Sequence, residues 1–88
     1  MSRKVIAIHQ QEGIELIFYD LPMGETIYVA DNKIEAFSFV DFDEGKIKKG
    51  IILVLSSGVP AHIYFSNEAM GEYHRIKREL EEIFDLEK

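Results

Sequence analysis

The sequence predicts an α+β domain in which an antiparallel meander of about six strands is closed by one long C-terminal helix. Turn-forming residues recur at intervals of about ten positions, and short alternating or apolar segments lie between them, as in consecutive hairpins. Near the C-terminus the apolar pattern changes to a helical period. The 88 residues suit one domain, spanning 1–88, with a single core.

Glycine, proline, asparagine and aspartate mark the breaks between the strands, at 10–13, 21–24, 31–33, 43–45 and 56–60. The segments between them predict strands at 3–9, 14–20, 25–30, 34–42, 47–56 and 61–65. Segment 51–55 is apolar at every position, so we expect a central strand that is covered on both faces. In 34–42, Phe37 and Phe39 share one face, while Val40 and Phe42 lie on the other.

A single amphipathic helix is predicted from about residue 67 to about residue 86. Its apolar stripe recurs at steps of three and four and consists of Ala69, Tyr73, Ile76, Leu80, Ile83 and Phe84. Charged residues occupy the opposite side of the helix. We therefore expect the stripe to hold the helix against the strands and to have a structural role.

Six antiparallel strands in meander order tend to curl, and a helix of ~30 Å can fill the open end of a curled sheet. This arrangement resembles a reduced pleckstrin-homology-like barrel, in which a strand meander precedes a C-terminal helix. The resemblance covers the order of elements across most of the chain and implies a curled sheet or a partly open barrel. Pleckstrin-homology domains that bind phosphoinositides usually hold the head group with basic residues around the first hairpin. Here the turn at 10–13 contains no cation, so lipid binding is not expected.

The composition favours a folded protein from a reducing compartment. Apolar residues make up 47% of the chain, too many for a disordered segment, and there is no cysteine for a disulfide or a zinc–thiolate site. The first apolar stretch ends at His9 and is too short for a signal peptide, and no run approaches the ~20 apolar residues of a membrane span. We therefore expect a cytoplasmic protein that does not contact a membrane.

The formal net charge of −6 opposes nonspecific binding to phosphate backbones and to anionic membranes. Basic residues gather at Lys46, Lys48 and Lys49, but no aromatic residue stands among them to stack on a base. Nucleic acid is therefore not expected as a direct ligand, whereas a protein partner is.

No catalytic motif occurs in the sequence, and we predict neither catalytic residues nor a cofactor. His9, His62 and His74 are the candidates for acid–base chemistry, which needs one protonated and one neutral imidazole, but no spacing links them. Histidines with local hydrogen-bond partners are the favoured interpretation. Two alternative functions stay open: a small nuclease or hydrolase that uses His62 with His9 or His74, and a barrel that carries a small apolar ligand.

Alternate turns of a meander share one end of the sheet, which predicts that Asp20 approaches Asp41, Asp43 and Glu44. Oxygen-rich clusters can bind Ca²⁺ or Mg²⁺, but this segment lacks the further ligands of an EF-hand loop. A solvated acidic rim is favoured over a metal site, and an acidic face that docks a basic partner is the intermediate interpretation.

The predicted function is that of a small non-enzymatic protein-interaction module, which binds its partner through a sheet edge or an aromatic face. An acidic inhibitor or an adaptor is a specific form of this hypothesis. The predicted interaction face consists of Phe37, Phe39, Asp41, Asp43, Glu44 and Asp20. Because the aromatic residues exceed what one helix can cover, barrel closure and homodimerisation are equally expected ways of burying the remainder.

Overall fold

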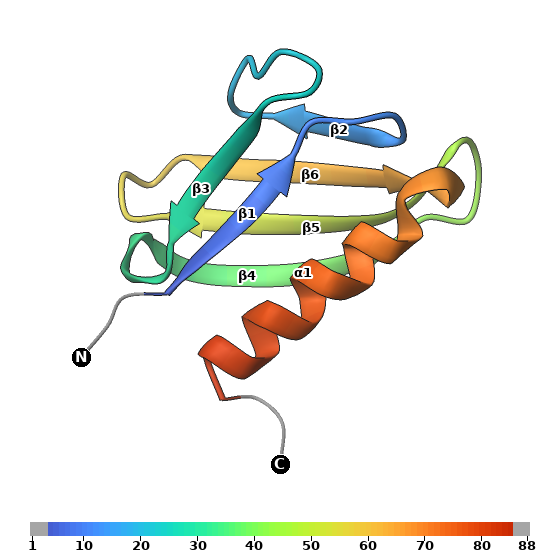
Figure 1. Ribbon diagram of the computed structural model, residues 1–88. Helices are drawn as coiled ribbons and strands as arrows, with labels where there is room; N and C mark the ends of the chain where they lie inside the picture. Colours follow the sequence, from blue (N-terminus) through green and yellow to red (C-terminus); the bar gives the residue numbers. More distant parts are fainter. Residues whose placement is uncertain (1–3, 86–88) are drawn as a thin grey trace.

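The computed structural model describes residues 4–85, which form six β-strands followed by one α-helix (Figure 1). The strands are β1 (Val5–His9), β2 (Ile14–Ile17), β3 (Thr26–Ala30), β4 (Ile34–Asp41), β5 (Ile47–Leu55) and β6 (Pro60–Ser66). Short 3-10 turns, Asp31–Lys33 and Asn67–Ala69, precede β4 and the helix α1 (Met70–Ile83). The predicted class, α+β with antiparallel strands and a C-terminal helix, is confirmed. Residue 3 of the predicted first strand and residue 86 of the predicted helix lie outside the described residues.

The strands pair in a different order from the predicted meander. β1 and β3 form a two-stranded ribbon, whereas the other strands form a sheet in the order β2-β6-β5-β4. Every pairing is antiparallel, but only β4, β5 and β6 follow one another as a meander. The two sheets do not close into a barrel.

The turn between β1 and β2 explains this departure. The ribbon continues as far as Gln10, whose N–H donates to the carbonyl of Glu25 (2.9 Å), and Gly13 then redirects the chain with a φ of 90°. The carbonyl of Gly13 accepts a hydrogen bond from the N–H of Ser66 (2.8 Å), and a Cβ at this position would lie only 3.1 Å from the Cβ of Ala69. Because glycine allows both the positive φ and this close approach, the turn docks beside the end of β6 and places β2 there.

The helix and the β1–β3 ribbon lie on the same side of the four-stranded sheet, which we call the covered face (Figure 1). Side chains that pair across neighbouring strands share a face, and two such rows form the centre of the covered face: Leu16–Ile63–Ile51–Phe39 and Ala61–Leu53–Phe37. Ile6 and Ile8 of the ribbon and Ile76 and Leu80 of α1 have no exposed surface and pack into the same core. Full burial of each such side chain stabilises the fold by about 1.5–3 kcal/mol.

The predicted apolar stripe of the helix faces this core. Tyr73 is buried together with Ile76 and Leu80, and Ile83 and Phe84 are partly buried against the same cluster. The ring of Tyr73 meets that of Phe65 edge-on, with centroids 5.4 Å apart. The helix ends at Ile83, and Asp85, with a φ of 57°, stands in the left-handed conformation that commonly terminates helices.

Candidate interaction surface

The four-stranded sheet has a second face, which carries neither the helix nor the ribbon and which we call the open face. Three rows of paired residues run across it: Ile17–His62–Ile52–Ser38, Glu15–Tyr64–Gly50–Val40 and Pro60–Val54–Ala36. Phe42, one residue beyond β4, joins the second row because it contacts the Cβ position of Gly50 and the ring of Tyr64. The open face is therefore contributed by all four strands of the larger sheet.

The open face is mainly apolar and accessible to solvent. Ile17 is 49% exposed and Phe42 is 39% exposed, while Ile52, Val54 and Val40 are half-buried by their neighbours in the sheet. Glu15, at the β2 margin, is the charged carboxylate among these residues. An apolar surface built on one continuous sheet differs from single exposed apolar residues, which are normal on any protein.

An aromatic cluster occupies one half of the open face. The rings of Phe42 and Tyr64 meet edge-on with centroids 5.7 Å apart, directly over Gly50. His62 Nδ1 and the Tyr64 hydroxyl oxygen are 2.8 Å apart and share a hydrogen bond, with the donor set by the histidine tautomer. Amphipathic rings of this kind provide large contact area with a polar group for orientation, which is why tyrosine is common at protein interfaces.

The aromatic residues of the predicted interaction face lie on the covered face instead. Phe37 packs against Phe84 with ring centroids 5.3 Å apart, and Phe39 packs against Tyr73 at 6.5 Å. Lys77 of α1 also lies over the ring of Phe39, with Nζ 4.9 Å from the centroid. Phe37 and Phe39 are therefore half-buried, because α1 and the residue after it reach β4, whereas Phe42 on the other face of the sheet is 39% exposed.

The predicted convergence of the acidic residues is also wrong. In the observed strand order, β2 runs antiparallel to β4, so Asp20 follows the β2 end that lies beside the start of β4. Asp41, Asp43 and Glu44 lie at the opposite end of the sheet, where β4 turns into β5. Asp41 instead pairs with Lys49 at 2.6 Å and raises the pKa of that lysine, chiefly through their hydrogen bond.

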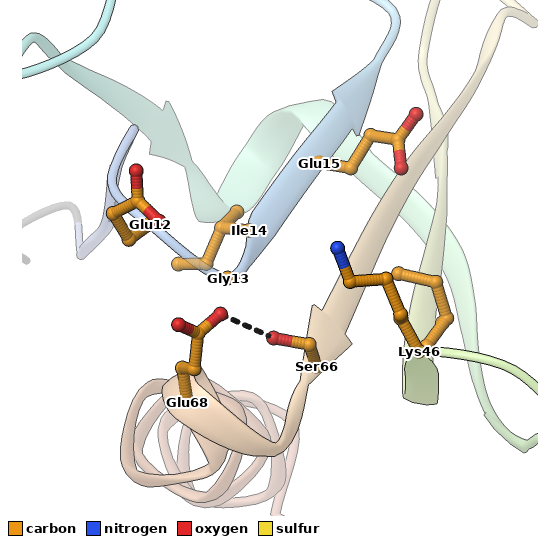
Figure 2. Close-up of a pocket in the computed structure, with 8 residues that line it drawn as sticks. Glu12, Gly13, Ile14, Glu15, Lys46, Ser66 and Glu68 are labelled. Atoms are coloured by element: carbon orange, nitrogen blue, oxygen red, sulfur yellow. Dashed lines mark hydrogen bonds between the residues drawn. The ribbon is translucent and has the colours of Figure 1, made fainter.

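A shallow hollow of about 320 Å³ opens at the end of the sheet where β2 and β5 begin. Glu12 and Glu68 stand on one side of it, and Glu15 and Lys46 on the other (Figure 2). The hydroxyl of Ser66 donates a hydrogen bond to Glu68 at 3.2 Å. Within residues 4–85, no group of three or more histidine, aspartate or glutamate side chains is arranged to hold a metal ion.

The sheet separates the histidines that were considered for catalysis. His62 projects from the open face, whereas His9 ends β1 and His74 lies on α1, both on the covered side. His9 Nδ1 is 2.7 Å from the hydroxyl of Thr26, and the ring of His74 stands against that of Tyr73. His62 therefore cannot act on one substrate group together with either of the other two.

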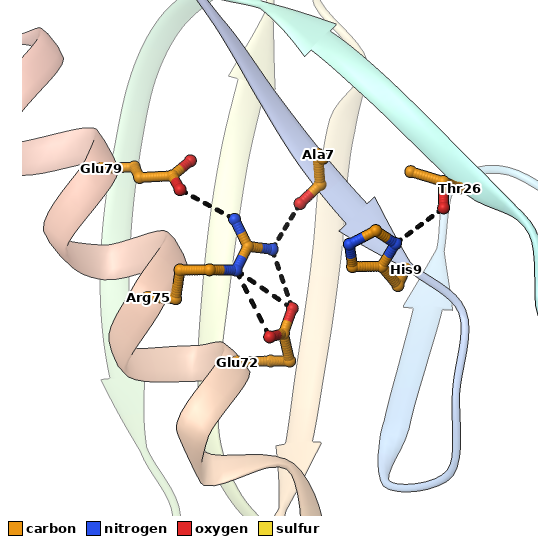
Figure 3. A network of polar contacts seen from close by, with 6 residues as sticks. All are labelled: Ala7, His9, Thr26, Glu72, Arg75 and Glu79. Carbon is orange, nitrogen blue, oxygen red and sulfur yellow. Dashed lines mark hydrogen bonds and ion pairs between the residues drawn. The ribbon is translucent and has the colours of Figure 1, made fainter.

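A charged network joins α1 to the ribbon (Figure 3). Arg75 donates hydrogen bonds to the carbonyl of Ala7 in β1 (2.6 Å), to Glu72 (2.8 Å) and to Glu79 (2.9 Å). The hydrogen bond from Arg75 lowers the pKa of Glu72, and the charge of Arg75 acts in the same direction. Because Arg75 bonds two carboxylates of its own helix and the carbonyl of Ala7 in β1, the network links α1 to the ribbon.

Comparisons of the chain with protein-family models, with curated proteins and with solved structures find no match. Within residues 4–85, no helix has both the length and the apolar character that crossing a lipid bilayer requires.

The candidate surface that sequence reasoning missed is the one around Ile52, His62 and Tyr64. The signal that could have identified it is the segment 51–55, which is apolar on both faces of the sheet. That pattern predicts a cover on each side of β5, and the described part of the chain supplies a cover on one side only.

Proposed function

We propose that this protein is a non-enzymatic protein-interaction module that binds its partner through the open face. The observation that carries the proposal is the two-sided apolar character of β5. Ile51 and Leu53 are buried under the helix and the ribbon, while Ile52 and Val54 point to the side on which residues 4–85 place no further layer. Sheets with apolar side chains on both faces are normally covered on both faces.

The chemistry of the open face suits a protein partner with an apolar surface. Its aliphatic side chains offer no donors or acceptors, and His62 Nδ1 and the Tyr64 hydroxyl bond each other. A cysteine-free chain of this kind is suited to a reducing compartment, and we place it in the cytoplasm.

The test is affinity capture from the native host with matched variants. Ile17→Lys places a charge on the open face, and Val5→Lys places the same charge on β1, away from that face. The two positions are a close match, because both are aliphatic strand residues with exposed fractions of 49% and 51%. We expect the wild type and Val5→Lys to retain the same protein partner and Ile17→Lys to lose it, because the ammonium group would have to give up its water in the contact.

Circular dichroism spectra that match the wild type would show that both variants are folded. Retention of the same partners by Ile17→Lys and by Val5→Lys would overturn the proposal that the open face is the binding surface.

A further inference from the structure

We infer that the partner on the open face is a second copy of this chain, so that two sheets pack face to face across a two-fold axis. The inference rests on the proposed function, because it names the occupant of the same surface. A two-fold axis places the same patch of both subunits in contact, and an apolar face can bury its surface against the apolar face of a copy. Packing of this kind produces a sandwich with both faces of β5 covered.

The distribution of charge favours a copy over a basic partner. The chain carries a formal net charge of −6. A basic protein would be attracted to those surfaces of the chain where its aspartate and glutamate side chains lie. The open face carries Glu15 at one margin, and its central strands contribute Ile52, Val54, His62 and Tyr64 instead. Repulsion between carboxylates opposes self-association of an acidic protein, and Glu15 is the one carboxylate among the paired residues of the open face.

The size of the open face is sufficient for a weak dimer. The strands β4, β5 and β6 have about eight residues each and, spaced at ~4.8 Å, cover about 14 Å by about 27 Å, and the four residues of β2 add a shorter strip, hence roughly 450 Å² per copy. Two copies would bury roughly 900 Å² in total, which is the size of weak and transient interfaces. The dimer should therefore dissociate in the micromolar range rather than be permanent.

Symmetry predicts which residues meet at the centre of this dimer. β6 and β5 are the central strands, and Ile52 and His62 are paired neighbours at the middle of the open face. A two-fold axis through the middle of the face brings Ile52 of each copy close to Ile52 of the other. Packed sheets lie ~10 Å apart, so thiols placed at this position would be joined by a short bifunctional linker rather than by a disulfide.

The first experiment is sedimentation equilibrium from low micromolar to submillimolar concentration. We expect a monomer–dimer equilibrium for the wild type and for Val5→Lys. In Ile17→Lys the dimer should dissociate at a concentration higher by at least about tenfold, because the introduced charge loses its hydration in the interface.

The second experiment uses the absence of cysteine from the natural chain. Ile52→Cys and Val5→Cys each provide a single thiol, one at the centre of the open face and one outside it. A bismaleimide with a reach of ~10 Å should convert Ile52→Cys into a covalent dimer and leave Val5→Cys monomeric. Addition of Ile17→Lys to Ile52→Cys should abolish the cross-link.

The outcomes separate this inference from the proposal on which it rests. A wild-type chain that stays monomeric at every concentration overturns the second copy as the occupant, while loss of a different captured protein by Ile17→Lys would still support the open face as a binding surface. A dimer that is insensitive to Ile17→Lys and does not cross-link through Ile52→Cys also overturns the inference, because it must use another surface.

Discussion

Gly50 is the single position on which the aromatic cluster of the open face depends. It is buried in the central strand β5 under side chains from both neighbouring strands. A Cβ added here would lie 2.9 Å from Cγ2 of Val40, 3.1 Å from Cδ1 of Tyr64 and 3.2 Å from Cε2 of Phe42. These distances are shorter than van der Waals contact, so the missing side chain of Gly50 is what allows the rings of Tyr64 and Phe42 to meet across the strand.

Gly50→Ala should therefore lower the free energy of unfolding by about 1–3 kcal/mol, because the added methyl group overpacks a close contact. Gly71→Ala is the matched control. Its Cβ would meet no heavy atom within 4 Å in the first turn of α1, and alanine favours the helix, so a gain of about 0.5 kcal/mol is expected. Urea denaturation of the three proteins measures both effects, and an unchanged midpoint for Gly50→Ala would contradict the close packing over β5.

Side-chain alternation predicts which residues of a strand share a face, but it does not show which face the helix covers. Phe37 and Phe39 were correctly placed together, and Val40 and Phe42 were correctly placed opposite them. Both faces of β4 carry large apolar side chains, so the pattern alone is symmetric. The direction in which α1 leaves β6 decides which face of the sheet is covered. That direction is set by the backbone conformation of the turn Asn67–Ala69.

The apolar stripe packs the helix α1 against the core, and lysine side chains cover the aromatic rings at its margins. Lys77 lies over the ring of Phe39 and bonds Glu81 at 2.8 Å, while Lys49 lies 5.9 Å from the ring centroid of Tyr73. The aliphatic part of a lysine can cover apolar surface while its ammonium group stays hydrated. Lys77 and Lys49 thus cover apolar rings at the boundary between helix and sheet, although their charge alone would assign them to the solvent face.

Truncation of the stripe should destabilise the protein strongly. Ile76→Ala or Leu80→Ala should each lower the free energy of unfolding by about 2–4 kcal/mol, because both side chains are fully buried and leave a cavity. Arg78→Ala, on the exposed side of the same helix, should change it by less than about 0.5 kcal/mol. Equal thermal stabilities of the three variants would show that α1 does not depend on the stripe.

The bounds of the strands could be predicted from the sequence, whereas their partners could not. Gly13 and Gly45 lie in two of the predicted turns and have a positive φ, and each strand lies within three residues of its predicted bounds. Pairing depends on where each turn packs. Gly13 places β2 beside β6 through a contact with Ala69, which lies more than 50 positions away in the sequence, and no local pattern encodes such a contact.

The β1–β3 ribbon and the helix are tied together by Arg75. Its guanidinium group bonds the carbonyl of Ala7 at the edge of the ribbon, and Glu72 and Glu79 hold it in place from its own helix (Figure 3). In the sequence Arg75 belongs to the charged side of the helix, opposite the apolar stripe. The contact arises because the ribbon lies across the covered face beside α1, a consequence of the β1–β3 pairing.

This network predicts how stability depends on pH. Arg75 lowers the pKa of Glu72 in the folded protein below the ordinary value of 4.5, mainly by a hydrogen bond to the carboxylate. A depressed pKa means that the ionised carboxylate stabilises the folded state at neutral pH. That contribution is fully present above pH 4.5 and is lost as the pH falls through the lower pKa of the folded state.

Glu72→Gln should therefore lower the free energy of unfolding at pH 7, by up to about 1 kcal/mol for a partly exposed ion pair. The difference from the wild type should shrink as the pH falls below 4.5, because the wild-type carboxyl group then becomes neutral as well. Glu82→Gln, at an exposed position on the same helix, removes the same charge outside the Arg75 network and is the matched control. Urea denaturation of the three proteins at pH values from 7 to about 3 measures the difference directly. If the difference in the free energy of unfolding between Glu72→Gln and the wild type stayed constant over this pH range, the carboxylate charge would not contribute to the link between α1 and the ribbon.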